Sequence, residues 1–333
     1  MGVKTMTIFE LIQELAPINC ASGSEAAITA KITELCKPYT EDITKTAMGN
    51  LVVHKPGNGK KVMLMAHCDT IGFIVTHYEE NGVLRLGVLG GQKLSTLPGT
   101  PVVFANGVRG VIGCDEKVDA KDIAVFNLYI DIGASSEAEA KQMVRRGDTA
   151  VLAGDTFAVG DKVFSPALNN RLGCAVLIDV LQKCKSDNDL YFVFTVQHEI
   201  GVRGAGSAAY GIDPEIAIAV EVTDSGDLPD PAFKTDVKMG GGAVIRVCNG
   251  VTISNPKLLN YLEFHAHDKV QRDVRSGGLT DLTAVQSIRG GIYAASAGVA
   301  IRHRNTAVQI ASLSDTEKLS KMLVNAVNSD MRI

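Results

Sequence analysis

Four runs of the sequence are apolar at nearly every position, and they constrain the fold more than any other feature. A strand with one face in water alternates polar and apolar side chains, so a run without this alternation is expected to be covered on both faces. Helical periodicity at residues 6–15 and 24–37 supplies helices for this cover, and SGSE before the second helix predicts a capping box of Ser22 or Ser24. The chain is therefore predicted to form an α/β fold, with a buried sheet between layers of helices. The four runs are LYFVFTVQ (190–197), IAIAVEV (216–222), AVIRV (243–247) and GVAIRHR (298–304).

The middle of the chain differs from both ends. From about residue 72 to 166 the β-rich runs are short and interrupted by glycines and turn residues. This pattern predicts a small β-barrel-like domain at residues 73–163, inserted into an α/β domain made of residues 1–72 and 164–333. Just before the insertion, two apolar runs flank the Pro-Gly-Asn-Gly sequence at 56–59, which predicts a β-hairpin.

Charge and hydrophobicity argue against several functions. The formal net charge is −4 and no run of lysine and arginine compensates for it, so nucleic acid is not expected as a partner. Residues 1–17 lack the core of a signal peptide, and no stretch of about 18 apolar residues follows that could span a membrane. The protein is therefore expected in the cytoplasm and away from membranes. Its seven cysteines are scattered and never form a C-x-x-C pair, which predicts neither a disulfide framework nor a thiolate zinc site.

Polar side chains follow several of the predicted strands. His67 and Asp69 form an H-x-D pair after one run. QHEIG places His198 and Glu199 after another, and VEVTD places Glu221 near the end of a third. Each alone also fits a half-buried histidine or an exposed turn. Because strand ends of an α/β sheet meet at one edge, and because imidazoles and carboxylates gathered there need a cation or hydrogen bonds, the set predicts a metal-assisted hydrolase.

Another polar pair, Asn169 and Asn170, stands at the head of the apolar sequence RLGCAVLIDVLQKC. Asparagine is a preferred N-cap residue, because its side-chain oxygen accepts a hydrogen bond from an unpaired N–H of the first helical turn. By itself, this pair predicts only the cap of a helix.

Together, these motifs resemble those of the tetrahedral, self-compartmentalising metalloaminopeptidases, the family that includes glutamyl and deblocking aminopeptidases. The resemblance covers nearly the whole chain. It implies a zinc-peptidase-like three-layer domain with a mixed, mostly parallel sheet, two divalent ions (zinc or cobalt), and the removal of single residues from the N-termini of short peptides. It also implies a homo-oligomer, either a dimer or a hollow dodecamer. The motifs are SGSE at 22, GNLVV at 49, AHCDTIGFIV at 66, ALNNRLGCAV at 167, TVQHEIGVRGA at 195, AIAVEVTDSGDLPD at 217, TD at 280 and VAIRHRNTAVQ at 299.

Four residues of the family's site are matched here. His67 corresponds to a metal-binding histidine, and Asp69 corresponds to the carboxylate that orients it. Glu199 matches the second glutamate of a Glu-Glu pair, which binds metal. Glu221 stands where the family usually has a metal-binding aspartate.

Three other positions depart from the family's pattern. The aspartate that bridges the two ions aligns with Asn169, the general-base glutamate aligns with His198, and the last metal-binding histidine aligns with Asn305. In this family the peptide bond after the bridging aspartate is often cis. A cis bond between Asn169 and Asn170 would therefore indicate that the backbone of the family's site is retained, whereas a trans bond would favour a simple helix cap.

These departures change the expected chemistry. An asparagine offers one neutral carbonyl oxygen where a bridging carboxylate brings a negative charge and two oxygens. The site formed by Asn169, Glu199 and Asn305 is therefore expected to bind its ion weakly or to be empty. For the other ion, His198 could join His67 and Glu221 in a His-His-Glu set, as in single-zinc hydrolases. Alternatively, His198 is a free catalytic residue that serves as the general base.

Two functions remain open from the sequence. One is an aminopeptidase-like hydrolase of altered or reduced activity, with one zinc or cobalt ion per chain. The other is a catalytically inactive relative, without a tightly bound ion, that binds peptides or serves as a structural subunit.

Overall fold

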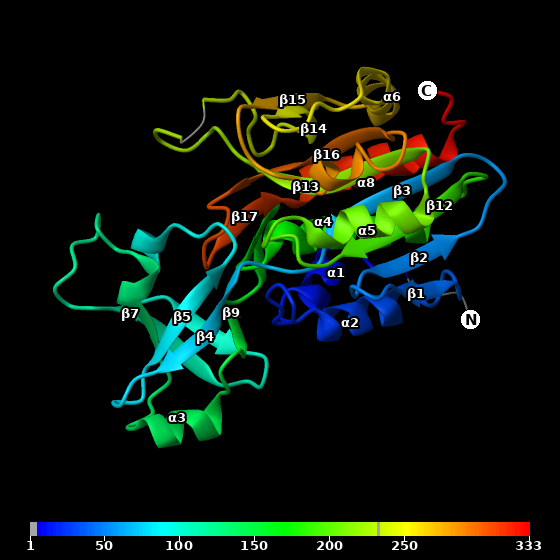
Figure 1. Cartoon of the computed structure of the whole chain (residues 1–333). Helices are drawn as coiled ribbons and strands as arrows, with labels where there is room; N and C mark the ends of the chain where they lie inside the picture. Colours follow the sequence, from blue (N-terminus) through cyan, green and yellow to red (C-terminus); the bar gives the residue numbers. More distant parts are fainter. Residues whose placement is uncertain (1–4, 232–233) are drawn as a thin grey trace.

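The computed structural model describes residues 5–231 and 234–333. A large sheet of eleven strands forms the body of the molecule, and a separate closed barrel extends from one side of it (Figure 1). The strands of the large sheet are β1 (Ile43–Lys45), β2 (Leu51–Lys55), β3 (Lys61–His67), β10 (Phe157–Val159), β11 (Lys162–Ser165), β12 (Asp189–Thr195), β13 (Ile216–Asp224), β14 (Ala243–Asn249), β15 (Val270–Arg275), β16 (Tyr293–Arg302) and β17 (Gln309–Ser312). Their order is β1-β2-β12-β3-β13-β16-β17-β11-β10, and β14 joins β15 to β16. The prediction of an α/β fold is confirmed.

The large sheet is mixed, as the resemblance implies. Its four central strands, β12, β3, β13 and β16, are parallel. The strands that flank these four, namely β2, β14 and β17, pair with them in the antiparallel direction. Three layers result, because helices cover both faces of the sheet (Figure 1).

The side chains of β3 explain why this strand lacks polar alternation. Val62 and Leu64 pack with one layer of helices, and Met63 and Met65 pack with the other. The first layer contains α1 (Ile8–Leu15), α2 (Ala26–Cys36), α4 (Leu168–Lys183), α6 (Pro256–Ala266) and α8 (Leu313–Asn328), and the second contains α5 (Arg203–Ile212) and α7 (Leu282–Val285). None of the helices within the described ranges is long and apolar enough to cross a membrane.

The predicted hairpin is wrong, although both of its strands exist. Strand β12 lies between β2 and β3, antiparallel to the first and parallel to the second. The turn itself is held by the start of β12, because the N–H groups of Asn58 and Gly59 donate to the carbonyl oxygen of Asp187 at 2.8 and 2.7 Å. A distant strand therefore separates two runs that are close in sequence.

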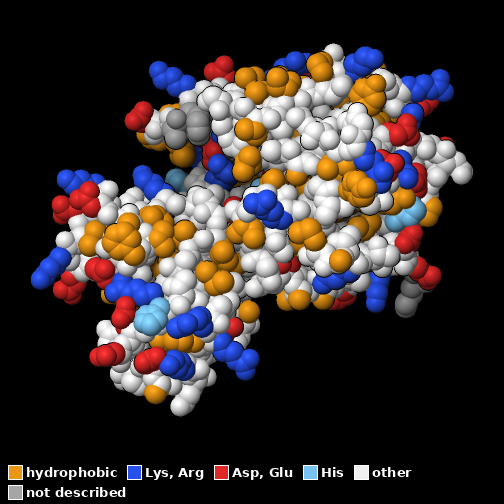
Figure 2. Space-filling model, in the orientation of Figure 1, with side chains coloured by type: hydrophobic (Ala, Val, Ile, Leu, Met, Phe, Trp, Pro, Cys, Tyr) orange, Lys and Arg blue, Asp and Glu red, His pale blue; other side chains and the backbone are white. Residues whose placement is uncertain are grey.

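The barrel contains six antiparallel strands in the order β4-β5-β8-β7-β6-β9 and encloses its own apolar core. Its elements are β4 (Gly72–Tyr78), β5 (Leu84–Leu89), η1 (Leu94–Thr96), β6 (Pro101–Phe104), β7 (Arg109–Cys114), η2 (Val125–Asn127), β8 (Leu128–Asp131), α3 (Glu137–Met143) and β9 (Thr149–Leu152). The predicted segment 73–163 also includes β10 and part of β11, which pair in the large sheet and not in the barrel. On the face in Figure 2, basic and acidic side chains are interspersed over both parts.

The predicted capping box of α2 is wrong. This helix begins without a side-chain cap, and the capping box lies instead at α1, between Thr7 and Glu10. Ser24 contacts the hydroxyl of Thr149 on the barrel. The Ser22 hydroxyl donates to Asp69 at 2.5 Å, so it supports the strand end where the candidate site lies.

Candidate metal centre

Three of the predicted residues converge at one edge of the large sheet. His67 ends β3, His198 follows β12, and Glu221 lies in β13. The ligand atoms of these residues, here called the imidazole cluster, all lie within 4.8 Å of one another. Nε2 of His67 is 3.9 Å from Oε2 of Glu221, and the two imidazole rings stack with their centroids 3.8 Å apart. A β-carbon at Gly298, the neighbour of Glu221 in β16, would lie 1.9 Å from the Glu221 carbonyl oxygen, so a glycine there lets β13 keep its position.

One ring nitrogen of His67 has no partner in the described part of the chain. Nδ1 lies 3.0 Å from the carbonyl oxygen of Asp69, so we assign the proton to Nδ1 and the lone pair to Nε2. Nε2 is buried and makes no hydrogen bond. Leaving a buried polar atom unpaired costs about 1–3 kcal/mol. Two imidazoles and one carboxylate match the donor set of single-zinc hydrolases, so the residues present fit a divalent cation.

Asp281 connects two members of the imidazole cluster. Its Oδ1 lies 2.7 Å from Nδ1 of His198, and its backbone N–H donates to Oε1 of Glu221 at 3.0 Å. Burial would lower the pKa of His198, but the carboxylates of Asp281 and Glu221 outweigh this effect and raise it to about 10. Thr280 and Asp281 were among the motifs of the resemblance, but no role was predicted for Asp281 from the sequence.

Asp69 is fully buried and holds the loop that follows β12. Its carboxylate accepts hydrogen bonds from the N–H groups of His198 (3.1 Å) and Glu199 (3.0 Å), in addition to the Ser22 hydroxyl. Burial would raise the pKa of Asp69, but His67 and these donors hold it well below its usual range. The contacts fit an orienting role, because they fix the loop that carries both polar residues of QHEIG.

The neighbouring part of the pocket is formed by Asn169, Glu199 and Asn305, here called the amide cluster. Nδ2 of Asn169 donates to Oε1 of Glu199 at 3.2 Å and to Oδ1 of Asn305 at 3.0 Å. Nδ2 of Asn305 donates in turn to the carbonyl oxygen of Gly91 at 3.3 Å, which fixes the orientation of both amides. Hydrogen bonds thus connect the three side chains directly to one another. Burial raises the pKa of Glu199.

The two asparagines at the head of α4 have different roles. The bond between Asn169 and Asn170 is cis, which is the alternative that indicates a retained site backbone. Oδ1 of Asn170 accepts from the N–H of Gly173 at 3.1 Å, and its Nδ2 donates to the carbonyl oxygen of Val220 at 2.8 Å. Asn170 therefore caps the helix, whereas Asn169 faces the pocket.

A cavity of about 380 Å³ lies in front of both clusters. Three arginines line its outer wall, Arg246, Arg275 and Arg304. Arg275 and Arg304 donate to Asp224 at 2.8 and 2.9 Å, and Arg246 donates to Asp273 at 3.2 Å. Three guanidinium groups thus share two carboxylates. The sequence did not indicate this wall, because its residues come from three separate parts of the chain, namely β14, the end of β15 and the segment after β16.

Arg171, on α4, holds the backbone behind His67. The side chain is fully buried and forms no ion pair with a carboxylate among the residues described. Its guanidinium donates to the carbonyl oxygens of Leu15 (3.1 Å), Ile18 (3.1 Å) and Cys68 and to Sγ of Cys20 (3.0 Å). Because Leu15 ends α1, its carbonyl lies at the negative end of the helix dipole, which helps to balance the buried charge.

The chain is similar to known proteins over nearly its whole length. The profile of the M42 glutamyl aminopeptidases matches residues 49–322. A protein of Acetivibrio thermocellus, named as a candidate aminopeptidase, is 39% identical over 325 residues, 96% of this chain and 98% of its own. The structure of aminopeptidase APDkam598 from Desulfurococcus kamchatkensis has a TM-score of 0.92 at 31% identity and covers 96% of this chain and 94% of its own. The Pyrococcus horikoshii TET1 peptidase, which can assemble into a tetrahedron or a large octahedral shell, has a TM-score of 0.87 at 29% identity, covering 96% and 99%.

Proposed function

Because the chain belongs to the M42 glutamyl aminopeptidase family, we propose that it removes residues from the N-termini of short peptides with a single divalent metal ion. The observation that carries this proposal is the unpaired, buried Nε2 of His67, which faces the other members of the imidazole cluster. His67, His198 and Glu221 would hold the ion, which we propose to be zinc or cobalt. A bound ion of this kind polarises the scissile carbonyl and increases the acidity of water.

A second ion is disfavoured by the amide cluster. The N–H groups of Asn169 already point at Glu199 and Asn305, the two side chains that would have to accept a cation beside it. To bind an ion, Asn169 would have to turn its amide, which would bring its oxygen against the carboxylate of Glu199. The cost of this rearrangement supports a site with one ion.

The roles of two adjacent residues are then exchanged relative to the family's pattern. We assign the ligand role to His198 and the general-base role to Glu199. Only one oxygen of Glu199 receives a hydrogen bond from the described residues, from Asn169, so the second oxygen remains available in the cavity. A base needs such an oxygen within about 3 Å of the proton that it removes from water. The same carboxylate can accept the N-terminal ammonium of a peptide.

The outer wall suggests which peptides bind. Its three arginines place guanidinium groups on this side of the cavity, paired with Asp224 and Asp273. An N-terminal glutamate or leucine is therefore expected to be accepted better than lysine, because like charges repel across a short distance. We further propose that the chain forms a homo-oligomer, a dimer or dodecamer, by analogy with the assembling TET1 peptidase.

The test combines metal counting with turnover. The full chain is saturated with zinc or cobalt, bound metal is measured by mass spectrometry, and hydrolysis of glutamyl-, leucyl- and lysyl-p-nitroanilide is followed. We expect one ion per chain and turnover that a chelator abolishes. Glu199→Gln should keep the ion but lower kcat by about 10² to 10⁴. The matched variant Glu221→Gln should lose the ion as well.

Two outcomes would contradict the proposal. Two ions per chain in the active protein would contradict the single-metal site. Neither metal nor turnover would point instead to a relative that binds peptides without cleaving them.

A further inference from the structure

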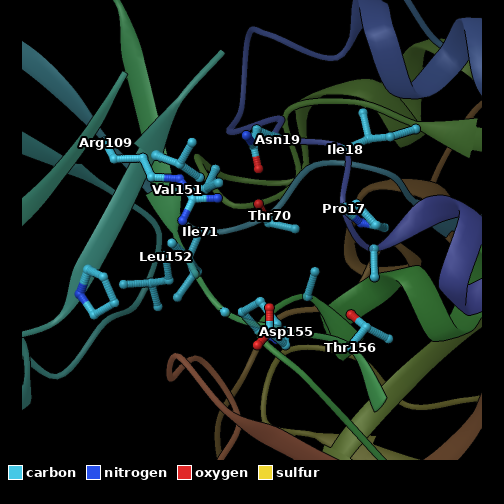
Figure 3. A pocket seen from close by; sticks show the side chains of 17 residues that line it. Pro17, Ile18, Asn19, Thr70, Ile71, Arg109, Val151, Leu152, Asp155 and Thr156 are labelled. Atoms are coloured by element: carbon cyan, nitrogen blue, oxygen red, sulfur yellow. The ribbon is translucent and has the colours of Figure 1, made fainter. Parts of the chain in front are cut away.

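A second cavity, of about 460 Å³, lies where the barrel joins the large sheet (Figure 3). Its walls come from the segment after α1, from barrel strands, and from both places where the chain crosses between sheet and barrel. These crossings contribute Thr70 and Ile71 on the way into the barrel and residues 153–156 on the way back to the large sheet, and Pro166 and Ala167, just before α4, complete the lining. The cavity has no lining residue in common with the cavity at the metal centre.

Two opposite charges line this cavity without neutralising each other. Arg109 belongs to β7, and Asp155 lies between β9 and β10. Neither side chain has a hydrogen bond or ion pair with any residue that the structure describes, and neither does the side chain of Asn19. In Figure 3, the guanidinium of Arg109 points into the cavity toward Ile71, and Asp155 lies on a different wall. A ligand that carries both a negative and a positive charge would satisfy both residues.

The remaining walls combine polar and apolar groups, and a few side chains form their apolar part. Pro17, Ile18, Ile71 and Leu152 lie around the charged groups (Figure 3), and the last two are only 3% and 5% exposed. The volume is at the small end of the range of about 300–1,000 Å³ that is typical of small-molecule sites. An apolar group of a few carbon atoms, attached to a doubly charged head, matches this combination of walls and size.

We propose that this cavity binds a free amino acid with an apolar side chain, such as leucine, in its zwitterionic form. Arg109 binds the carboxylate through two parallel N–H donors, and Asp155 accepts from the ammonium group. The side chain packs against Ile71 and Leu152. Free amino acids are also the products of the proposed reaction, but this binding does not require that the metal centre is active.

The test is calorimetric titration of the metal-loaded full chain with L-leucine, N-acetyl-L-leucine and L-leucinamide. Leucine should bind, and each of the other two, which lacks one charge, should bind at least about tenfold more weakly. Arg109→Gln and Asp155→Asn should each weaken leucine binding by a similar factor. Both side chains are exposed, so neither change is expected to disturb folding.

The control distinguishes the two cavities. Arg304→Gln, in the wall of the metal-centre cavity, should leave leucine binding unchanged. The proposal is overturned if leucine does not bind at millimolar concentration, or if Arg304→Gln removes binding while Arg109→Gln preserves it. Equal binding of leucine and leucinamide would also overturn it. If the full chain binds leucine but has no peptidase activity, only the proposed function is refuted.

Discussion

The imidazole cluster and the amide cluster lie side by side at one cavity, yet their polar atoms are arranged in opposite ways. In the first, a buried nitrogen of His67 remains without a hydrogen bond in the described structure. In the second, Asn169 donates to both of its neighbours, so its N–H groups face the two side chains that would have to bind a cation beside it. An asparagine has nearly the shape of an aspartate but presents N–H donors where the acid has an oxygen. We therefore propose that a change of one atom turns a metal ligand into a group that excludes metal.

The largest expected effect comes from removing a ligand in the imidazole cluster. His67→Gln should weaken zinc binding by more than about 100-fold, because even residues that only orient ligands change metal affinity by about 10- to 100-fold. Isothermal titration of the metal-free chain with zinc measures the affinity. The matched change in the amide cluster, Asn305→Ala, should leave zinc affinity unchanged. Equal losses in both variants would show that the two clusters form one site.

A smaller effect, a change in the number of bound ions, is expected when one acid and one imidazole are introduced into the amide cluster. The double change Asn169→Asp and Asn305→His removes the donors that bind Glu199 and adds a negative charge and a nitrogen ligand. The metal content should rise from one ion to two per chain, measured by mass spectrometry after saturation with zinc. His198 stays as it is, because it belongs to the imidazole cluster.

Asn170→Asp is the control for this gain, since it adds the same charge at the neighbouring position that caps α4. It should not add an ion. If the double variant still binds one ion, then the amides are not what excludes the second.

The smallest effect is expected at a third histidine, His54, which lies outside both clusters. His54 has a carboxylate at both ring nitrogens, Asp42 at 2.6 Å and Asp189 at 2.7 Å, so neither nitrogen is open to a metal. Burial would lower the pKa of His54, but the two carboxylates outweigh it and raise the pKa. A raised pKa in the folded state stabilises the protein below the unfolded value of about 6.5, and this contribution disappears as the pH rises through the folded value.

His54→Gln should therefore lower the unfolding free energy by about 1 kcal/mol near pH 6 and by less near pH 9, without changing zinc affinity. Urea denaturation of the metal-free chain at the two pH values measures the difference. The same loss at both values would mean that the protonated ring contributes nothing.

The sequence predicts what depends on periodicity and strand ends, and it misses what depends on distant contacts. His67 and Glu221 could be placed together because parallel strands end at one edge of a sheet. The separation of β2 from β3 could not be predicted, because β12 enters between them from more than 120 residues later. Asp281 was missed because its role is set by contact with His198, 83 residues away. The state of Asn169 depends on an amide orientation that Gly91 fixes through Asn305.

Arg171 also has a consequence for the order in which the molecule assembles. Its contacts join α4 to Leu15, 156 residues earlier, and to Cys68, 103 residues earlier. Contacts of such long range form late in folding, since the intervening chain has to be closed into a loop. The whole barrel lies within the loop between Cys68 and Arg171. The backbone next to His67 therefore takes its final position only when α1, the two ends of the barrel segment and α4 have come together. During synthesis, the candidate metal centre cannot form before the barrel segment and α4 have been made.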